Sequence, residues 1–185
     1  MAEIEAKIEY GNLKKLIAAM SKEHKVKVGL LASKGGSDEV SENLDLAGLG
    51  AVHEFGATIN VTDKMRGFFK HNFGVNLKKT TTQINIPARS WLQMPLTKQN
   101  ELKKKLLNKF GSKEELIEYI ASTGDMMSLA VMLGAAAVEQ INEAFETEGW
   151  GEWQPDSPIT IAKKGSANPL IDTGRLSNAV TYEIE

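Results

Sequence analysis

The first 32 residues alternate between the apolar spacing of strands and that of a helix. Residues 4–10 place apolar side chains at every second position, which is typical of a half-buried strand. Apolar residues then recur at helical spacing over residues 12–23, and residues 25–32 return to strand character. A strand, a helix and a second strand are therefore predicted at this end.

In the middle of the chain, short elements of both kinds are expected. Residues 44–56 favour a short helix that ends near Gly56, where glycine can adopt a left-handed conformation. Residues 58–62 and 81–86 favour strands, and Pro87 ends the second because it has no amide hydrogen to donate. Leucine spacing over residues 90–110 predicts one further helix.

The second half carries clear signals for where helices begin and end. Ser112 and Glu115 form a capping-box pair, and Asp125 is suited to cap the longest helix, which should run to about residue 146. Ser157, followed by proline, begins a helix of about two turns that ends at Gly165. A last short helix reaches residue 179, and residues 180–184 alternate as a closing strand.

Two polar stretches lack a clean period. Residues 33–43 are polar and glycine-containing, which predicts a mobile, solvated loop. Residues 63–80 mix aromatic and basic side chains, which we interpret as an irregular arm or hairpin. We hypothesise that both segments become ordered on contact with neighbouring subunits.

The chain as a whole is expected to form one α+β domain over residues 1–185. A small mixed or antiparallel sheet would pack against the long helix of the second half and against the N-terminal helix. The 185 residues suffice for a substantial core, and the absence of cysteine excludes disulfides and thiolate chemistry.

Composition narrows the function without identifying it. The 22 basic and 24 acidic residues give a formal net charge of −2, so no overall positive field attracts nucleic acid. We expect no targeting segment, because acidic residues occupy the N-terminus. The longest largely apolar stretch, residues 126–138, is too short for a membrane span, and we expect no membrane contact.

Candidate chemistry is sparse, and we expect no enzyme, no cofactor and no metal. His53-Glu54 resembles the start of a zinc-protease helix, but Ala57 stands where the second histidine would be needed. Asp172-Thr173-Gly174 matches the short motif of aspartic proteases, yet only eleven residues follow it. A turn or capping role suits Asp172 better. Residues 29–37 contain glycines and a lysine but lack the ending of a phosphate-binding loop.

Two further groups of residues invite a binding role. Five lysines make the predicted helix at 90–110 basic, and they are Lys98, Lys103, Lys104, Lys105 and Lys109. DNA phosphates or an acidic protein are possible partners for this helix, although a solvated face is the preferred interpretation. Trp150 and Trp153 stand among glycines and a proline, where an indole ring can fix a loop to the core or anchor a partner.

Several motifs, in a fixed order, resemble the virion-morphogenesis or tail-completion proteins of tailed bacteriophages. They read AVHEFGATI, VTDKMRGFF, INIPARSWL, GWGEWQPDSPITIAKKG and PLIDTGRLSNAVTYEI, with a long helix between the third and the fourth. The resemblance spans most of the chain from Ala51 onwards. The motif positions that look fold-defining are His53, Glu54, Phe55, Gly56, Pro87, Ala88, Arg89, Trp91, Trp153, Asp172, Thr173, Gly174 and Leu176.

From these positions we expect specific structural roles. The planar guanidinium of Arg89 can pair with a carboxylate such as that of Glu54, or it can bind carbonyl groups. Gly56 and Gly174 would supply turns that a side chain obstructs.

The resemblance implies a structural protein of the head–tail junction, a neck or tail-completion component made in the bacterial host cytoplasm. It would bind copies of itself in a ring and contact the connector on the portal side or the tail tube and its terminator. A hexamer is preferred because tail tubes of this class are six-fold, and DNA would be contacted at most through the channel lining. Tail terminator and connector or adaptor roles remain alternatives, as do an aspartic protease built on Asp172 and a DNA-binding module built on the lysine-rich helix.

Overall fold

A computed structural model of the chain describes residues 14, 17–18, 21 and 23–185. The strand predicted at residues 4–10 lies outside the described residues, and so does most of the helix predicted at residues 12–23. Within that helix, Lys14, Ile17 and Ala18 are helical.

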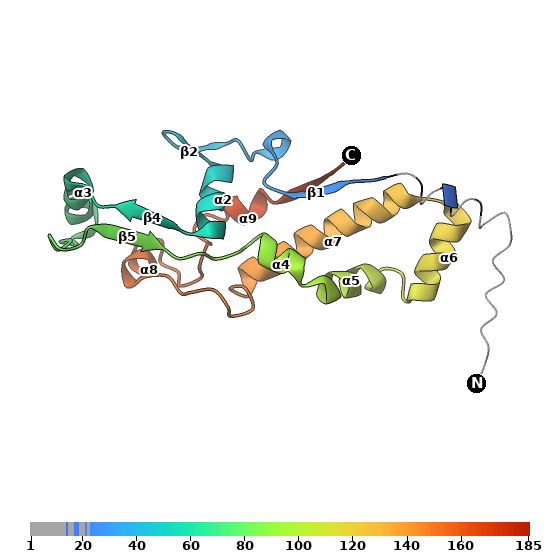
Figure 1. The fold of residues 1–185 in the computed structure, drawn as a ribbon. Coiled ribbons are helices and arrows are strands. Elements are labelled where there is room, and N and C mark those ends of the chain that lie inside the picture. Colours follow the sequence, from blue (N-terminus) through green and yellow to red (C-terminus); the bar gives the residue numbers. More distant parts are fainter. Residues whose placement is uncertain (1–13, 15–16, 19–20, 22) are drawn as a thin grey trace. The chain divides into compact units, whose positions relative to one another are not determined.

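The protein belongs to the α+β class, as predicted, and its strands pair two by two (Figure 1). The pairs are β1 with β6, β2 with β3, and β4 with β5; the last two pairs are antiparallel. The elements are β1 (Val26–Gly29), a 3-10 helix η1 (Ala32–Lys34), β2 (Glu39–Ser41), β3 (Leu44–Asp45), α2 (Leu46–Phe55), β4 (Ala57–Asn60), α3 (Asp63–Phe73), β5 (Gln83–Ile86), α4 (Gln93–Thr97), α5 (Gln99–Asn108), α6 (Lys113–Thr123), α7 (Met126–Glu146), α8 (Pro158–Lys164), α9 (Arg175–Asn178) and β6 (Thr181–Ile184).

The described residues divide into two compact units. The first contains the described residues up to Val28, together with Lys98–Glu139 and Tyr182–Glu185, and the second contains Gly29–Thr97 and Gln140–Thr181. Helix α7 contributes residues to both units.

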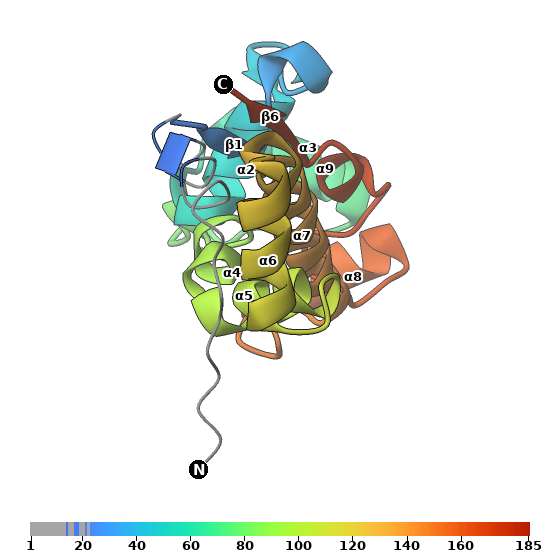
Figure 2. The same cartoon turned by 90° about the vertical axis from the view of Figure 1, so that its right-hand side faces the viewer.

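The first unit joins helices α5, α6 and the beginning of α7 to the terminal strand pair. Figure 2 shows β1 and β6 side by side, and the backbone groups of Lys25 and Glu185 extend their pairing with two hydrogen bonds. Gly134 in α7 lies so close to the ring of Tyr182 in β6 that a side chain there would overlap the ring. The small residue therefore sets the approach of this strand to the helix.

The second unit is built around an aromatic core. Phe145, almost fully buried near the end of α7, lies between the rings of Trp91 and Trp153, at centroid distances of 5.9 and 5.7 Å. Ile141 is buried one helical turn earlier on the same face. This core supports the segments that carry most of the motif residues.

The helix boundaries follow the capping signals in the sequence. The side chains of Ser112, Asp125 and Ser157 accept hydrogen bonds from backbone amides three residues later, at 3.1, 2.9 and 3.2 Å. Helices α6, α7 and α8 consequently begin where the sequence predicted.

Both stretches without a clean period contain regular structure. Residues 33–43 include part of η1 and all of β2. The expected irregular arm instead begins with helix α3, because the Thr62 hydroxyl accepts from the amide of Met65 and Gly74 ends the helix with a φ of 65°. Local capping therefore produced a helix that apolar spacing alone did not indicate.

The prediction of a single helix over residues 90–110 is wrong, because the chain forms two helices there, α4 and α5, which are separated at Lys98. The side-chain amide of Gln140 donates to the carbonyl of Pro95 at 2.5 Å. A continuous helix would need that carbonyl for the amide of Gln99. A long-range hydrogen bond thus competes with the local one.

A close backbone crossing sets the start of the β4–β5 hairpin. Its register pairs Ala57 with Ile86, and Gly56 just before it has φ 72° and ψ 169°. A Cβ atom on Gly56 would lie 2.8 Å from the carbonyl oxygen of Ile86 and 2.9 Å from the amide of Ala88. Only glycine fits this crossing without strain.

We expect Gly56→Ala to lower the free energy of unfolding by about 2 kcal/mol or more, because it adds both steric overlap and an unfavourable φ. Gly67→Ala is the matched control, since it lies within α3 and nothing lies within 4 Å of a Cβ atom there. That substitution should stabilise the protein by up to about 1 kcal/mol. Urea unfolding of both variants measures the contrast, and equal effects would contradict the crossing.

Candidate functional site

Two motif segments, one around His53 and one around Arg89, lie against each other in the second unit. The backbone amide of Arg89 donates to the carbonyl of His53 at 2.8 Å. This bond continues the contact that begins at the β4–β5 hairpin. The end of α2 and the segment before α4 are therefore fixed together.

Glu54 uses its buried carboxylate to bind the beginning of α4. With only 6% of its surface exposed, it accepts hydrogen bonds from the hydroxyl of Ser90 at 2.6 Å and from the amides of Leu92 and Gln93 at 2.8 and 3.0 Å. A negative charge next to free amides at a helix start is favourable. Glu54 is thus a structural cap.

Arg89 is only 5% exposed, and it connects the segment before α4 to the loop after α7. Its Nε donates to the carbonyl of Gln154 at 2.6 Å, and its Nη2 donates to the carbonyl of Pro155 at 3.1 Å and to Asp156 Oδ1 at 3.0 Å. The carboxylate partner is therefore Asp156 rather than Glu54. The planar donor fork does bind carbonyls, as the sequence analysis allowed.

Asp156 is the centre of a buried ion network formed by Arg89, Asp156 and Lys164. Its second oxygen accepts from Lys164 Nζ at 2.6 Å, and the same ammonium donates to the carbonyl of Asn168 at 2.6 Å. The side chains of Asp156 and Lys164 are 7% and 9% exposed. Arg89 and Lys164 each contact the Asp156 carboxylate and at least one backbone carbonyl, and Asp156 contacts both cations. These contacts offset the loss of hydration of the three charges.

The tryptophans of the motifs are structural in this unit. Trp91 donates from its indole nitrogen to the carbonyl of Gly50 at 2.8 Å, and Trp153 donates to the carbonyl of Ser90 at 3.3 Å. Both rings also contact Phe145. Trp153 therefore fixes its loop to the core, which was one of the two roles considered for it.

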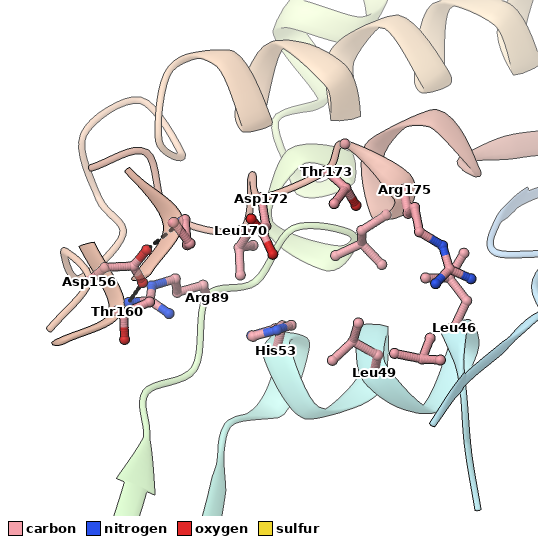
Figure 3. A pocket seen from close by; sticks show the side chains of 14 residues that line it. Leu46, Leu49, His53, Arg89, Asp156, Thr160, Leu170, Asp172, Thr173 and Arg175 are labelled. Atoms are coloured by element: carbon pink, nitrogen blue, oxygen red, sulfur yellow. Dashed lines mark hydrogen bonds and ion pairs between the residues drawn. The ribbon is translucent and has the colours of Figure 1, made fainter. Parts of the chain in front are cut away.

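A cavity of about 410 Å³ is lined on one side by the side chains of this network (Figure 3). Helix α2 provides one wall with Leu46, Leu49 and His53, and the chain around α9 provides the opposite wall. In Figure 3 the side chain of Asp172 extends toward His53. The lining is mixed: leucines at one part, and charged groups at the other.

His53 is a partly buried histidine in the lining of this cavity. Burial lowers its pKa below 6.5, and the positive charge of Arg89 lowers the pKa further, against a smaller opposing effect of Asp156. Its Nδ1 atom is buried and has no hydrogen-bond partner. The imidazole is consequently neutral at pH 7.

The segment Asp172-Thr173-Gly174 forms a turn rather than a carboxylate pair. Gly174 has φ 75°, Leu176 is buried, and Asp172 and Thr173 are exposed. An aspartic protease needs a second carboxylate that shares a proton with the first. The other aspartate lining the cavity is Asp156, both of whose oxygens accept from cations.

Other motif residues have different surroundings. Phe55 is 74% exposed at the end of α2, and Ala88 is exposed, whereas Pro87 is half-buried. Sequence analysis missed Asp156 and Lys164 as partners of Arg89. The segment that carries both had been recognised only as a capped helix, and no local pattern identifies a partner 67 residues away.

Within the part of the chain that the structure describes, no three histidine, aspartate or glutamate side chains gather in a way that could bind a metal ion. None of the helices described there is both long and apolar enough to cross a lipid bilayer.

No protein-family model, curated protein or solved structure matches the chain.

We expect Asp156→Asn to lower the free energy of unfolding by about 3–5 kcal/mol, because it leaves Arg89 and Lys164 buried without their counter-charge. Asp63→Asn removes the same charge from a fully exposed side chain 3.8 Å from Arg66 and should change stability by less than about 0.5 kcal/mol. Chemical unfolding of both variants tests the difference. Similar small effects would mean that the network does not stabilise the fold.

The lowered pKa of His53 predicts weaker folding in mild acid. Because an unfolded histidine takes up its proton at about pH 6.5, before the buried one does, stability should fall as the pH drops from about 6.5 toward 5.5. His53→Gln should flatten this part of the curve, whereas His71→Gln, at an exposed position, should leave it unchanged. Thermal unfolding from pH 5.5 to 8 measures both, and a curve unaffected by His53→Gln would contradict the assignment.

Proposed function

We propose that this chain is a structural protein of the bacteriophage head–tail junction, a tail-completion or neck component that acts in virion assembly through protein contacts. It is made in the host cytoplasm, forms a ring of copies, preferably a hexamer, and binds the connector on the portal side or the tail tube. It performs no catalysis and needs no cofactor. Tail terminator and connector or adaptor are alternatives within the same junction.

The main support for this proposal is that the motif residues use their polar groups for contacts within the protein. Glu54, Arg89, Trp91 and Trp153 direct their polar groups to backbone atoms and to other protein side chains. Such groups fix segments in place and leave little for a substrate to bind. This use favours a scaffold, and it agrees with the order of motifs that resembles tail-completion proteins.

Exposed apolar side chains give the scaffold surfaces for partners. Phe55, Ile59, Phe68 and Ile159 in the second unit remain between 37% and 74% exposed. Large apolar groups at the surface are typical of protein–protein contacts when they occur together with polar rims. An assembly protein needs several such contacts at once.

The alternatives have weaker support. An aspartic protease would need a second carboxylate to share a proton with Asp172, but the other aspartate of the cavity, Asp156, is already bound by Arg89 and Lys164. For DNA binding by the lysine-rich helix, Lys105 pairs with Glu139 at 3.0 Å and Lys104 lies 4.0 Å from Glu101. Neighbouring carboxylates reduce the field that such a helix offers to phosphates.

The proposal predicts that purified protein is captured by one of the two halves of the virion. Tailless heads and isolated tails of the phage that encodes the chain are mixed separately with the protein and sedimented through a gradient. Co-sedimentation with one particle, and recovery of joined particles when the other is added, is the expected result.

A variant with Asp172→Asn serves as a control in the same experiment, because an assembly role does not require that carboxylate. Loss of particle joining in this variant, together with cleavage of a particle protein by the wild type, would instead support the protease. Failure of the wild type to sediment with either particle would contradict the junction role.

A further inference from the structure

The segment from β4 to β5, residues 57–86, is a basic arm on the second unit. It contains five basic residues and one acidic residue, Asp63, so its net charge is +4. Because the whole chain has a net charge of −2, the remaining residues together carry −6. The charge of this protein is therefore strongly divided. The basic residues of the arm are Lys64, Arg66, Lys70, Lys78 and Lys79.

The arm has a defined shape because Arg66 is used internally. Its guanidinium donates to the carbonyls of Lys78 and Thr81 at 2.6 and 2.8 Å, and more weakly to that of Leu77 at 3.2 Å. Helix α3 is thereby tied to the loop that leads into β5. The four lysines of the arm are all exposed on this fixed frame.

An apolar groove lies between the arm's helix α3 and helix α8. It has a volume of about 740 Å³ and is lined by Phe68, Phe73, Val75, Pro158, Ile159 and Lys163, among others. Phe68 is 53% exposed, and the Lys163 ammonium lies 5.5 Å from the centre of the Phe73 ring. A partner that fits here would combine acidic groups with apolar side chains.

The same unit carries a surface of that chemistry. The hairpin formed by β2 and β3, residues 38–45, contains four acidic residues and no basic one, a net charge of −4. All four carboxylate side chains are exposed, and Val40 and Leu44 lie between them. These residues form the acidic hairpin: Asp38, Glu39, Glu42 and Asp45.

We infer that the basic arm of one copy, together with the α3–α8 groove, binds the acidic hairpin of a second copy. The two surfaces have opposite charges of equal size, and α3 and β2 lie apart in Figure 1. Two different surfaces on each copy form a heterologous contact, which leaves one arm and one hairpin free for the next copies. Repetition of the contact produces a ring or a filament.

A second copy suits this surface better than nucleic acid does. The residues outside the arm carry −6 and would repel phosphates, whereas four of those charges lie on the very hairpin that the contact would neutralise. The groove between α3 and α8 is also predominantly apolar. Apolar side chains of a protein fill such a groove more favourably than a phosphate backbone does.

This inference rests on the proposed function, because it identifies the contact through which copies of the chain would form the proposed ring. The two ideas nevertheless fail separately. Self-association is measured on the purified chain alone, whereas the junction role is measured by capture onto heads or tails.

Paired charge reversals test the contact. In the arm variant, Lys78→Glu and Lys79→Glu are combined, and in the hairpin variant, Glu39→Lys and Glu42→Lys are combined. Each variant alone should associate at least about tenfold more weakly than wild type, because the substitutions reduce the net charge of the arm or of the hairpin to zero and so remove the attraction between them. Mixed in equal amounts, they should associate again in pairs, since the unchanged arm of the hairpin variant, at +4, meets the unchanged hairpin of the arm variant, at −4. Sedimentation velocity over a concentration series measures all four samples.

Matched controls separate the contact from general effects of charge. Lys103→Glu combined with Lys104→Glu makes the same charge change on α5, in the first unit, and should leave the association unchanged. Phe68→Ala should weaken it while retaining the far-ultraviolet circular dichroism of a folded chain. Added salt should weaken it as well.

Three results would overturn the inference. Wild-type protein that stays monomeric at all concentrations contradicts it, even when heads or tails capture that monomer and the junction role stands. An oligomer that neither arm nor hairpin reversal changes places the contact elsewhere. Binding of a DNA duplex that the arm variant loses, without any change in oligomer mass, assigns the arm to nucleic acid.

Discussion

The buried ion network of Arg89, Asp156 and Lys164 is the interaction on which the rest of the second unit depends. Removing three charges from water is costly, and the cost is offset only because each group also meets carbonyls or a second opposite charge at 2.6–3.1 Å. The network joins the segment before α4 to the loop after α7 and to α8. It thereby positions α8, which forms one wall of the groove, and its three charged side chains line part of the cavity.

Local signals in the sequence predicted much of this fold, and long-range contacts explain the remainder. Ser112, Asp125 and Ser157 identify helix starts because a cap acts within three residues. The division between α4 and α5 depends on Gln140, and the partner of Arg89 is 67 residues away, so neither has a local pattern. Several motif residues, among them Arg89, Trp91 and Trp153, do meet in space, but Asp156 was not recognised as the partner of Arg89, and Phe55 is exposed.

The structural roles of the motif residues also bear on the function of the protein. Motif residues that looked chemically suggestive, such as Glu54 and Asp172, serve as a helix cap and as part of a turn. The apolar groove, the exposed lysines of the basic arm and the acidic hairpin remain available for partners, and all three belong to the second unit. A fixed interior with two oppositely charged surfaces is a physical arrangement suited to repeated assembly, and it is why we favour a structural role over catalysis.

The most direct test of the proposed junction role is electron cryomicroscopy of complete virions of the phage to which that proposal assigns the chain. The account predicts a closed ring of this protein between the portal and the tail tube, in which the basic arm of each copy contacts the acidic hairpin of the next. Virions that lack the chain, or that contain it only in the capsid or at the tail tip, would contradict the central claim.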